Sequence, residues 1–99
     1  MTRYIKSDYN QFVAGGSSTT LHTGVGKILA MILTTTNVAP ETTTIYDNTA
    51  AAGNVLLTLN VTNTAPVFII FPPKYPPVFK TGLTIVTAAN TDAFIITEA

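Results

Sequence analysis

The sequence predicts an all-β fold, a single small β-sandwich or jelly-roll of about seven to eight strands with an extended N-terminal arm. Three observations carry this prediction: short runs rich in β-branched residues, turn sequences between them, and no run of ten or more residues with a convincing helical period. The chain has 99 residues, which is enough for one domain and not for two. It can bury about 60–70% of its unfolded surface, so a core is possible although the sequence has no cysteine for disulfides.

Residues 1–20 differ from the rest of the chain, and we interpret them as an N-terminal arm and hinge that precedes a β-sandwich domain over residues 21–99. The segment carries three aromatic residues and ends in the flexible run AGGSSTT. Arms of this type usually fray. The aromatic residues favour docking instead, either on a neighbouring subunit or on the chain's own body. The contact residues that we expect in the arm are Tyr4, Ile5, Tyr9 and Phe12.

From residue 21 onward the sequence predicts a series of strands. GKILAMILTTT also suits a helix, but the glycines before it and the threonines at its end favour a buried strand. TTTIYD favours a strand because threonine and isoleucine are β-branched. VLLTLNV alternates, so that Val55, Leu57, Leu59 and Val61 share one face. GLTIVTA and DAFIITEA, near the C-terminus, are short and β-branched.

Turn chemistry separates these strands. The breaks fall at residues 37–41, 47–54, 62–66, 72–82 and 88–92. The second break, DNTAAAGN, places Asp47 beside Asn48 and could hold a cation, but calcium takes six to eight oxygen ligands and one carboxylate supplies few of them. We favour a hairpin turn with side-chain hydrogen bonding, closed by Gly53 and Asn54 at positive φ.

The segment FIIFPPKYPPVFKTGL, residues 68–83, contains the spacing PxxP, which could bind a recognition domain as a polyproline II helix. Its flanks are core-like strands, however, and no basic residue stands where such motifs usually carry one. Proline cannot continue a central ladder, so the two Pro-Pro pairs end one strand and delay the next. We therefore predict a stiff loop that carries Lys74 and Tyr75 outwards. Val78 and Phe79 would complete a loop contact, unless Phe79 is simply a core residue.

Charged residues make up only 10% of the chain and the net charge is zero, whereas soluble domains carry about 25% charged residues. An isolated monomer of this composition would have a poorly solvated surface, so we expect much of the surface to be buried against other subunits. A monomer coated with threonine and asparagine is the alternative. The basic residues form no stripe, which argues against nucleic acid. No apolar run approaches the roughly 18 residues of a membrane helix, and the N-terminus lacks the apolar region of a secretory signal.

The sequence offers little for catalysis or metal binding. The acidic residues are isolated from one another, and His22 is the single histidine. One histidine without cysteines or clustered acids makes a poor metal site, so we assign it a structural or incidental role. GVGKI resembles a phosphate-binding loop, but Leu21 stands where the pattern requires glycine and Ile28 where it requires serine or threonine. We therefore expect no enzymatic activity, no cofactor, no metal and no small-molecule substrate.

Two stretches, TTTIYDNTAAAGNVLLTL and VFKTGLTIVTAANTDAFIITEA, resemble a recurrent type of small bacteriophage virion protein. The matching residues are Ile45, Tyr46, Asp47, Asn48, Thr49, Ala50, Ala51, Gly53, Phe79, Gly82, Leu83, Val86, Thr91 and Asp92. The resemblance covers residues 27–98 and leaves out the arm. The chain departs from the pattern in the proline loop, where such proteins have a short turn, and at its end, IITEA.

The resemblance implies a β-sandwich module of a phage particle, and our leading hypothesis is a non-enzymatic capsid decoration (cement) protein that stabilises the head by subunit-subunit contacts. Its partners would be the major capsid protein and copies of itself, as a homotrimer. It would lie on the capsid surface of a virion assembled in the host cytoplasm. The alternative is a tail, neck or baseplate fibre module, which could bind a host glycan. A small carbohydrate-processing jelly-roll is a third hypothesis, which the lack of clustered acids and histidines disfavours.

Overall fold

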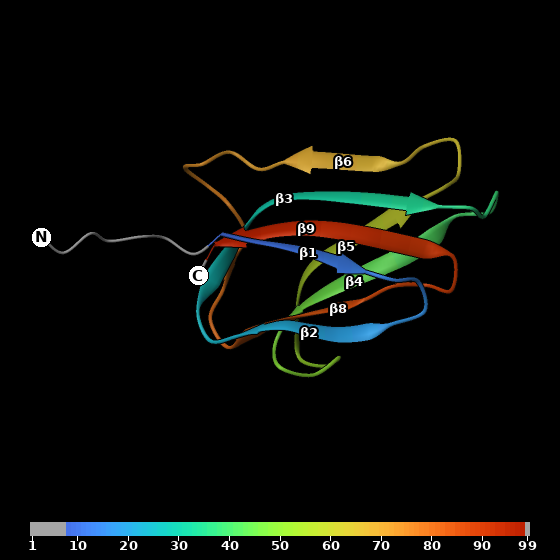
Figure 1. The fold of residues 1–99 in the computed structure, drawn as a ribbon. Helices are drawn as coiled ribbons and strands as arrows, with labels where there is room; N and C mark the ends of the chain where they lie inside the picture. The colour runs from blue at the N-terminus through green and yellow to red at the C-terminus, as the bar shows by residue number, and fades with distance from the viewer. Residues whose placement is uncertain (1–7, 99) are drawn as a thin grey trace, which may run out of the picture.

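The protein folds into two antiparallel sheets that pack face to face (Figure 1). The computed structural model describes the backbone of residues 8–98 and the side chains from Gln11 onward. In this part of the chain nine strands form and no helix does, which confirms the all-β sandwich. Residues 8–98 therefore contain no helix that is long and apolar enough to cross a membrane.

The first sheet has the strand order β1-β9-β3-β6, with β7 pairing β3 beyond the end of β6. Its strands are β1 (Asp8–Val13), β3 (Gly26–Thr35), β6 (Val67–Ile70), β7 (Val78–Phe79) and β9 (Thr91–Glu98). The second sheet has the order β2-β8-β4-β5. Its strands are β2 (Ser18–Thr23), β4 (Glu41–Asp47), β5 (Asn54–Val61) and β8 (Gly82–Val86). The open edges of the first sheet are thus β1 on one side and β6 with β7 on the other.

The sandwich begins earlier than the expected boundary at residue 21. β1 pairs along its whole length with β9, and its last residue, Val13, is buried in the core. β2 begins at Ser18 and pairs with β8. Gly16, with a φ of 73°, lies in the turn between these two strands, so the run that we expected to be a hinge is a connection inside the domain. Only residues 1–7 of the expected arm remain, and they lie outside the described part of the chain.

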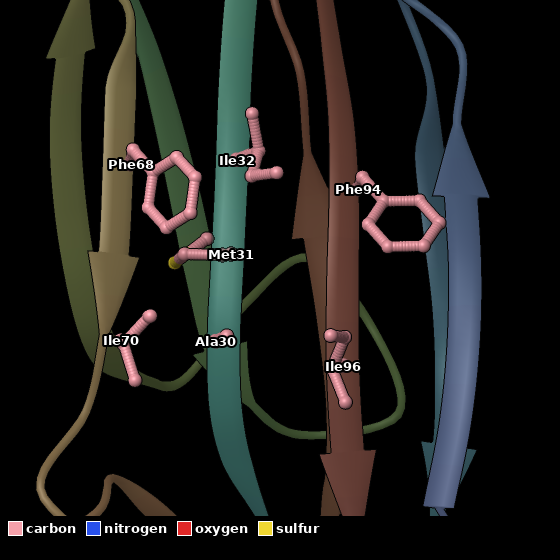
Figure 2. A pocket seen from close by; sticks show the side chains of 7 residues that line it. All are labelled: Ala30, Met31, Ile32, Phe68, Ile70, Phe94 and Ile96. Carbon is pink, nitrogen blue, oxygen red and sulfur yellow. The ribbon is translucent and has the colours of Figure 1, made fainter.

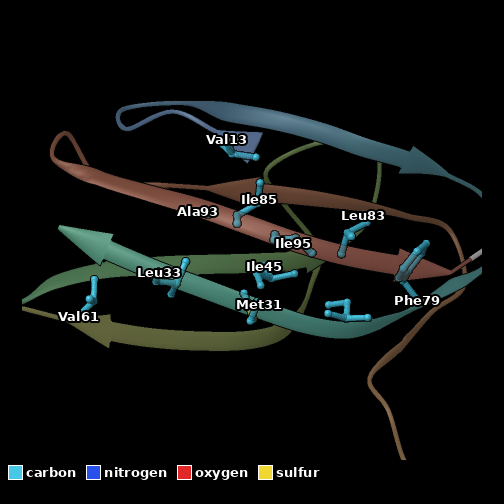
Figure 3. Packing of buried hydrophobic residues seen from close by; sticks show 11 residues of the cluster. Val13, Met31, Leu33, Ile45, Val61, Phe79, Leu83, Ile85, Ala93 and Ile95 are labelled. Atoms are coloured by element: carbon cyan, nitrogen blue, oxygen red, sulfur yellow. The ribbon is translucent and has the colours of Figure 1, made fainter. Parts of the chain in front are cut away.

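The core lies between the two sheets (Figure 3). Its buried apolar side chains are Val13, Ile28, Met31, Leu33, Ile45, Val61, Phe79, Leu83, Ile85, Ala93 and Ile95. Phe79 is the largest of the fully buried side chains. Gly26 stands opposite Phe79 in the pairing of β3 with β7, and a Cβ atom on Gly26 would overlap the Phe79 ring. Close packing therefore explains why a glycine occupies that position.

A β-bulge in β3 decides which of its side chains point into the core. The pairing of β3 with β9 shifts between Ile28 and Ala30, which makes Leu29 an extra residue. The bulge allows Ile28 and Met31 both to be buried although three positions separate them. Beyond the bulge the alternation is regular, so Ala30 and Ile32 lie on the opposite, outer face.

β6 and β7 are two halves of one edge strand that the proline segment interrupts. The Phe71 amide donates to the Leu29 carbonyl (2.9 Å), and the Ile28 amide donates to the Pro77 carbonyl (2.9 Å). Positions 71 and 77 therefore pair with successive residues of β3, and residues 72–76 form a loop that is left out of the ladder. The predicted loop between two strands is present. Its prolines lie at positions where no carbonyl group of β3 needs an N–H donor, so the missing N–H groups cost no ladder hydrogen bond.

Replacement of Phe79 by alanine should destabilise the fold by about 3–5 kcal/mol, because it leaves a cavity between the sheets. Tyr75→Ala is the matched control. It removes an aromatic ring that is 76% exposed, so it should change the free energy of unfolding by less than about 0.5 kcal/mol. Urea unfolding of both variants measures the difference, and equal effects would contradict the place of Phe79 in the core.

Candidate protein interface

The outer faces of the two sheets differ in chemistry, and the second sheet presents hydroxyl groups. Thr20 Oγ1 and Thr84 Oγ1 form a hydrogen bond of 3.0 Å, and Thr42 Oγ1 donates to Asn60 Oδ1 (2.8 Å). Thr84 Oγ1 also donates to the Asn48 carbonyl (2.8 Å), so the loop after β4 folds against this face. The threonine-coated surface that the composition allowed is therefore present, but it covers one sheet only.

The outer face of the first sheet is apolar (Figure 2). Residues that pair in an antiparallel ladder lie on the same face, and the register aligns the side chains in two rows across the strands. One row joins Phe12, Phe94, Ile32 and Phe68, and the other joins Ile96, Ala30 and Ile70. We call these seven residues the outer apolar face. Figure 2 shows all of them except Phe12, around a shallow hollow that Met31 also lines.

The outer apolar face leaves large side chains in contact with water. Phe12 is 66% exposed, Phe68 68% and Ile70 72%. With about 200 Å² per phenylalanine side chain, the two phenylalanines alone expose about 270 Å² of apolar surface. The largest apolar patch on a typical monomer measures about 300–600 Å² and is often functional. Beyond one end of the two rows the outer face becomes polar, with an ion pair between Lys27 and Glu98 (2.9 Å).

The contact residues expected in the arm have different outcomes. Tyr4 and Ile5 lie outside the described residues, and the backbone of Tyr9 lies in β1 opposite Thr97. Phe12 belongs to the outer apolar face, so its exposure comes from a strand of the sandwich and not from a separate arm. β1 and β6 lie at opposite edges of the sheet, and the structure therefore does not bring Phe12 and the proline loop together.

The contact residues expected around the proline loop divide into two groups. Lys74 and Tyr75 are exposed in the loop, where the Tyr75 amide donates to the Pro72 carbonyl (3.1 Å) and closes a turn. Val78, on β7, is 47% exposed. Phe79 is fully buried and is available to no other subunit in this fold. The alternative interpretation of Phe79 as a core residue is correct, because β7 turns it inward beside Gly26.

Most of the outer apolar face escaped prediction from the sequence. The runs VFII and AFII are apolar at successive positions. In an antiparallel sheet, where one face is commonly solvated, such a run indicates apolar surroundings on both faces. The signal was ambiguous because a strand inside a closed core gives the same pattern. Only the register, which places Ile32 between Phe94 and Phe68, shows that these side chains form one row on the outer face.

Glu41, at the start of β4, holds three segments together. Its carboxylate accepts hydrogen bonds from Thr91 Oγ1 (2.7 Å), Asn37 Nδ2 (3.0 Å), the Asn90 amide (3.1 Å) and Thr35 Oγ1 (3.2 Å). The bonds from Thr91, Asn37 and Asn90, that from Thr91 first, lower the pKa of Glu41 to about 2. Glu41 therefore anchors the turn that precedes β4 and the turn that precedes β9 at one end of the sandwich.

Asp47, at the other end of β4, anchors the approach to β8. Its Oδ1 accepts the backbone amides of Thr81 (2.8 Å), Lys80 (2.9 Å) and Gly82 (3.4 Å). The bond from Thr81 is the largest cause that lowers the pKa of the Asp47 carboxyl group. One carboxylate oxygen thus accepts backbone amides, as in a turn.

The loop after Asp47 is the hairpin connection that the sequence favoured. The Asn48 side chain donates to the Ala52 carbonyl (2.8 Å) across the loop. Gly53 adopts a φ of 90°, whereas Asn54, which we also expected at positive φ, does not. One left-handed residue therefore suffices to close this turn.

The charged residues form no metal centre in the part of the chain that the structure describes. No group of three or more His, Asp or Glu side chains comes together there. His22 contacts the Phe79 ring edge-on, with 5.5 Å between the ring centroids and 65° between the planes. That contact fits the structural role expected for His22.

The comparisons with known proteins bear on the fold. No family model and no curated protein matches the sequence. A solved chain from the Bacillus endospore appendages, described as a novel family of disulfide-linked pili, is 15% identical, with 99% of this chain and 91% of that chain covered and a TM-score of 0.51. A chain from the extra small virus VLP of the giant freshwater prawn Macrobrachium rosenbergii is 12% identical over 99% and 80% of the two chains, with a TM-score of 0.40. The first likeness shows a shared fold.

The lowered pKa values of Glu41 and Asp47 predict that acid destabilises the protein. A carboxyl group whose pKa is lower in the folded chain stabilises the fold above its unfolded pKa, 4.5 for Glu41, and the contribution is lost as the pH falls toward about 2. The urea concentration at the unfolding midpoint should therefore decrease as the pH is lowered from about 5 to about 2. Glu41→Gln should lower the midpoint at pH 7 and flatten the pH dependence. A wild-type midpoint that stays constant over this range would contradict the structural role of these carboxylates.

Proposed function

We propose that the protein is a structural subunit that works by assembling with other protein subunits through the outer apolar face. The observation that carries this proposal is the contrast between a threonine-coated sheet and a sheet whose outer face has two rows of phenylalanine, isoleucine and alanine. Exposed apolar side chains cost free energy in water. A covered outer apolar face removes that cost.

The size of the face fits a contact that is repeated many times. Burial of the exposed area of Phe12 and Phe68 alone, about 270 Å², at about 25 cal/mol per Å² provides about 7 kcal/mol before the costs of association. Lost translational and rotational freedom offsets much of that gain, so a single contact of this size is weak. Repetition over a symmetric particle strengthens it through avidity.

Within this class we propose a capsid decoration (cement) protein of a bacteriophage virion, without enzymatic activity. The support is the resemblance over residues 27–98 together with the low charged fraction of 10%. The partners would be the major capsid protein and copies of this chain, with a homotrimer as the proposed unit on the capsid surface. The outer apolar face would lie against the capsid or a neighbouring copy.

The second candidate is a tail, neck or baseplate fibre module. Exposed aromatic side chains favour it, since aromatic residues are enriched at recognition surfaces. Phe12, Phe68 and Tyr75 are all more than half exposed, and Tyr75 lies at the proline loop, where a host glycan could be contacted. The position of the chain in an imaged particle separates the two candidates. Copies spread over the head lattice support decoration, and a few copies at one vertex support the tail module.

The double substitution Phe12→Thr and Phe94→Thr should release the protein from particles. It converts part of the outer apolar face into the hydroxyl chemistry of the other sheet, so the fold should be kept. The amount bound to purified particles should fall by about tenfold or more, because two apolar contacts are lost. Val55→Thr, at a 51% exposed site on β5, is the control and should bind as the wild type does. Full retention of the double variant would contradict the proposed role of the face.

A further inference from the structure

The open edge of β6 is built to pair with the same edge of a second copy of this chain. We infer that two copies join β6 to β6 in antiparallel register, with Ile69 on the two-fold axis. Phe68 and Ile70 of one copy then stand opposite Ile70 and Phe68 of the other. This inference rests on the proposed role as an assembling subunit, and it names one contact of that assembly.

The ladder inside the chain shows which backbone groups of β6 are unused. The Phe71 amide donates to Leu29, which makes this pair a hydrogen-bonded one. Hydrogen-bonded and non-hydrogen-bonded pairs alternate along an antiparallel ladder, and the register is regular from Val67 to Phe71. The N–H and C=O groups of Phe68 and Ile70 therefore point away from β3. β6 has no other strand beside it in the described sheet, so these groups face the open edge.

The prolines on both sides of β6 limit how a strand can be added. Pro66 and Pro72 lie just outside β6 at the same two-residue spacing, and neither has an N–H to donate. Usable donors therefore remain only at Phe68 and Ile70. A register centred on Ile69 is the one that pairs both of these residues in both copies. Each of the two hydrogen-bonded pairs then exchanges two N–H···O bonds.

β6 is short, but it carries no charged residue and no proline within the strand to protect its edge. Natural edges carry charges, especially lysine, or prolines within the strand, whereas β6 reads VFII. The two side chains at the open positions, Phe68 and Ile70, are 68% and 72% exposed. The opposite edge, β1, begins with Asp8, and the edges of the second sheet, β2 and β5, carry threonine and asparagine. The described chain thus leaves one edge strand that is apolar throughout.

The joint fits the chemistry of the outer apolar face. Paired residues share a face, so Phe68 of one copy packs beside Ile70 of the second copy, and the apolar rows of both copies become continuous on one side. The four side chains at the joint expose on the order of 500 Å² before association. Stable interfaces bury about 1,200–2,000 Å² in total. The contact is therefore weak in solution and suited to linking units within a particle, where a trimer would use a different surface.

A cysteine at position 69 tests the register directly. The chain contains no cysteine, so Ile69→Cys gives one thiol per subunit. In the inferred register the two cysteines form a non-hydrogen-bonded pair with about 4.5 Å between Cα atoms, which is within the range of a disulfide. Oxidised glutathione should convert Ile69→Cys to a covalent dimer much faster than it converts Val55→Cys, the control on the edge strand β5. Equal rates, or a cross-link to a different protein in assembled particles, would overturn the inference.

A matched pair of substitutions at position 70 isolates the backbone contribution. Ile70→Pro and Ile70→Thr both remove the isoleucine, but only proline removes the outward N–H. Proline is tolerated at an edge where that N–H faces solvent, and the Phe71 amide remains bonded to Leu29. In the Ile69→Cys background the proline variant should cross-link about tenfold more slowly than the threonine variant, since two hydrogen bonds per pair of copies are lost. Equal rates in the two variants would overturn the ladder.

The outcomes of these experiments distinguish an error in the β6 pairing from an error in the proposed function. If Ile70→Pro stays on particles and the cysteines do not pair, while Phe12→Thr with Phe94→Thr is released, β6 pairing is wrong and assembly through the outer apolar face stands. If the cysteines pair and the Phe12 and Phe94 variant is retained, the edge contact stands and the face has another role.

Discussion

The ladder between β3 and β9 is the constraint on which the rest of the structure depends. It runs through the middle of the first sheet and sets which side of each residue faces the second sheet. In this register Met31 and Ile95 enter the core, while Ile32 and Phe94 stand next to each other outside. A slip of one residue would exchange the two sets. The bulge at Leu29 fixes the register at one end, and the hydrogen bonds of Glu41 fix the turn before β9 at the other.

The difference between the two outer faces follows from the same periodicity. On the second sheet the outward positions carry threonine, and hydroxyl groups such as those of Thr20 and Thr84 satisfy one another. On the first sheet the two middle rows of outward positions carry hydrocarbon side chains, of which Phe12, Phe68 and Ile70 are largely exposed. Polar side chains are therefore distributed unevenly between the outer faces of the two sheets. One sheet has a hydroxyl-rich outer face, and the other has an apolar outer face that the proposed assembly would cover.

The strands and turns of the body were largely predictable, because β-branched runs and turn residues are local signals. VLLTLNV and GKILAMILTTT form strands, and the loops after Asp47 and Phe71 interrupt them as expected. The expected common face of VLLTLNV was wrong at Val55, because a bulge places Val55 beside Tyr46 on the outer side and not with Leu57. The start of the sandwich was not predictable, because DYNQFV has no clear period and forms β1 only by pairing with β9 at the far end of the chain. The outer apolar face was also out of reach, since an apolar run does not tell whether its second face is buried in the same chain or exposed.

The accessibility of three phenylalanines, before and after assembly, tests the central claim most directly. Hydroxyl-radical footprinting can follow Phe12, Phe68 and Phe94 in the isolated chain and in purified particles, with the exposed Val38 of the loop before β4 as the reference. All three rings should be modified in the isolated chain, and Phe12 and Phe94 should become protected in the particle, while Val38 provides the baseline. Equal modification of the rings in both states would show that the outer apolar face stays in water and would contradict the account.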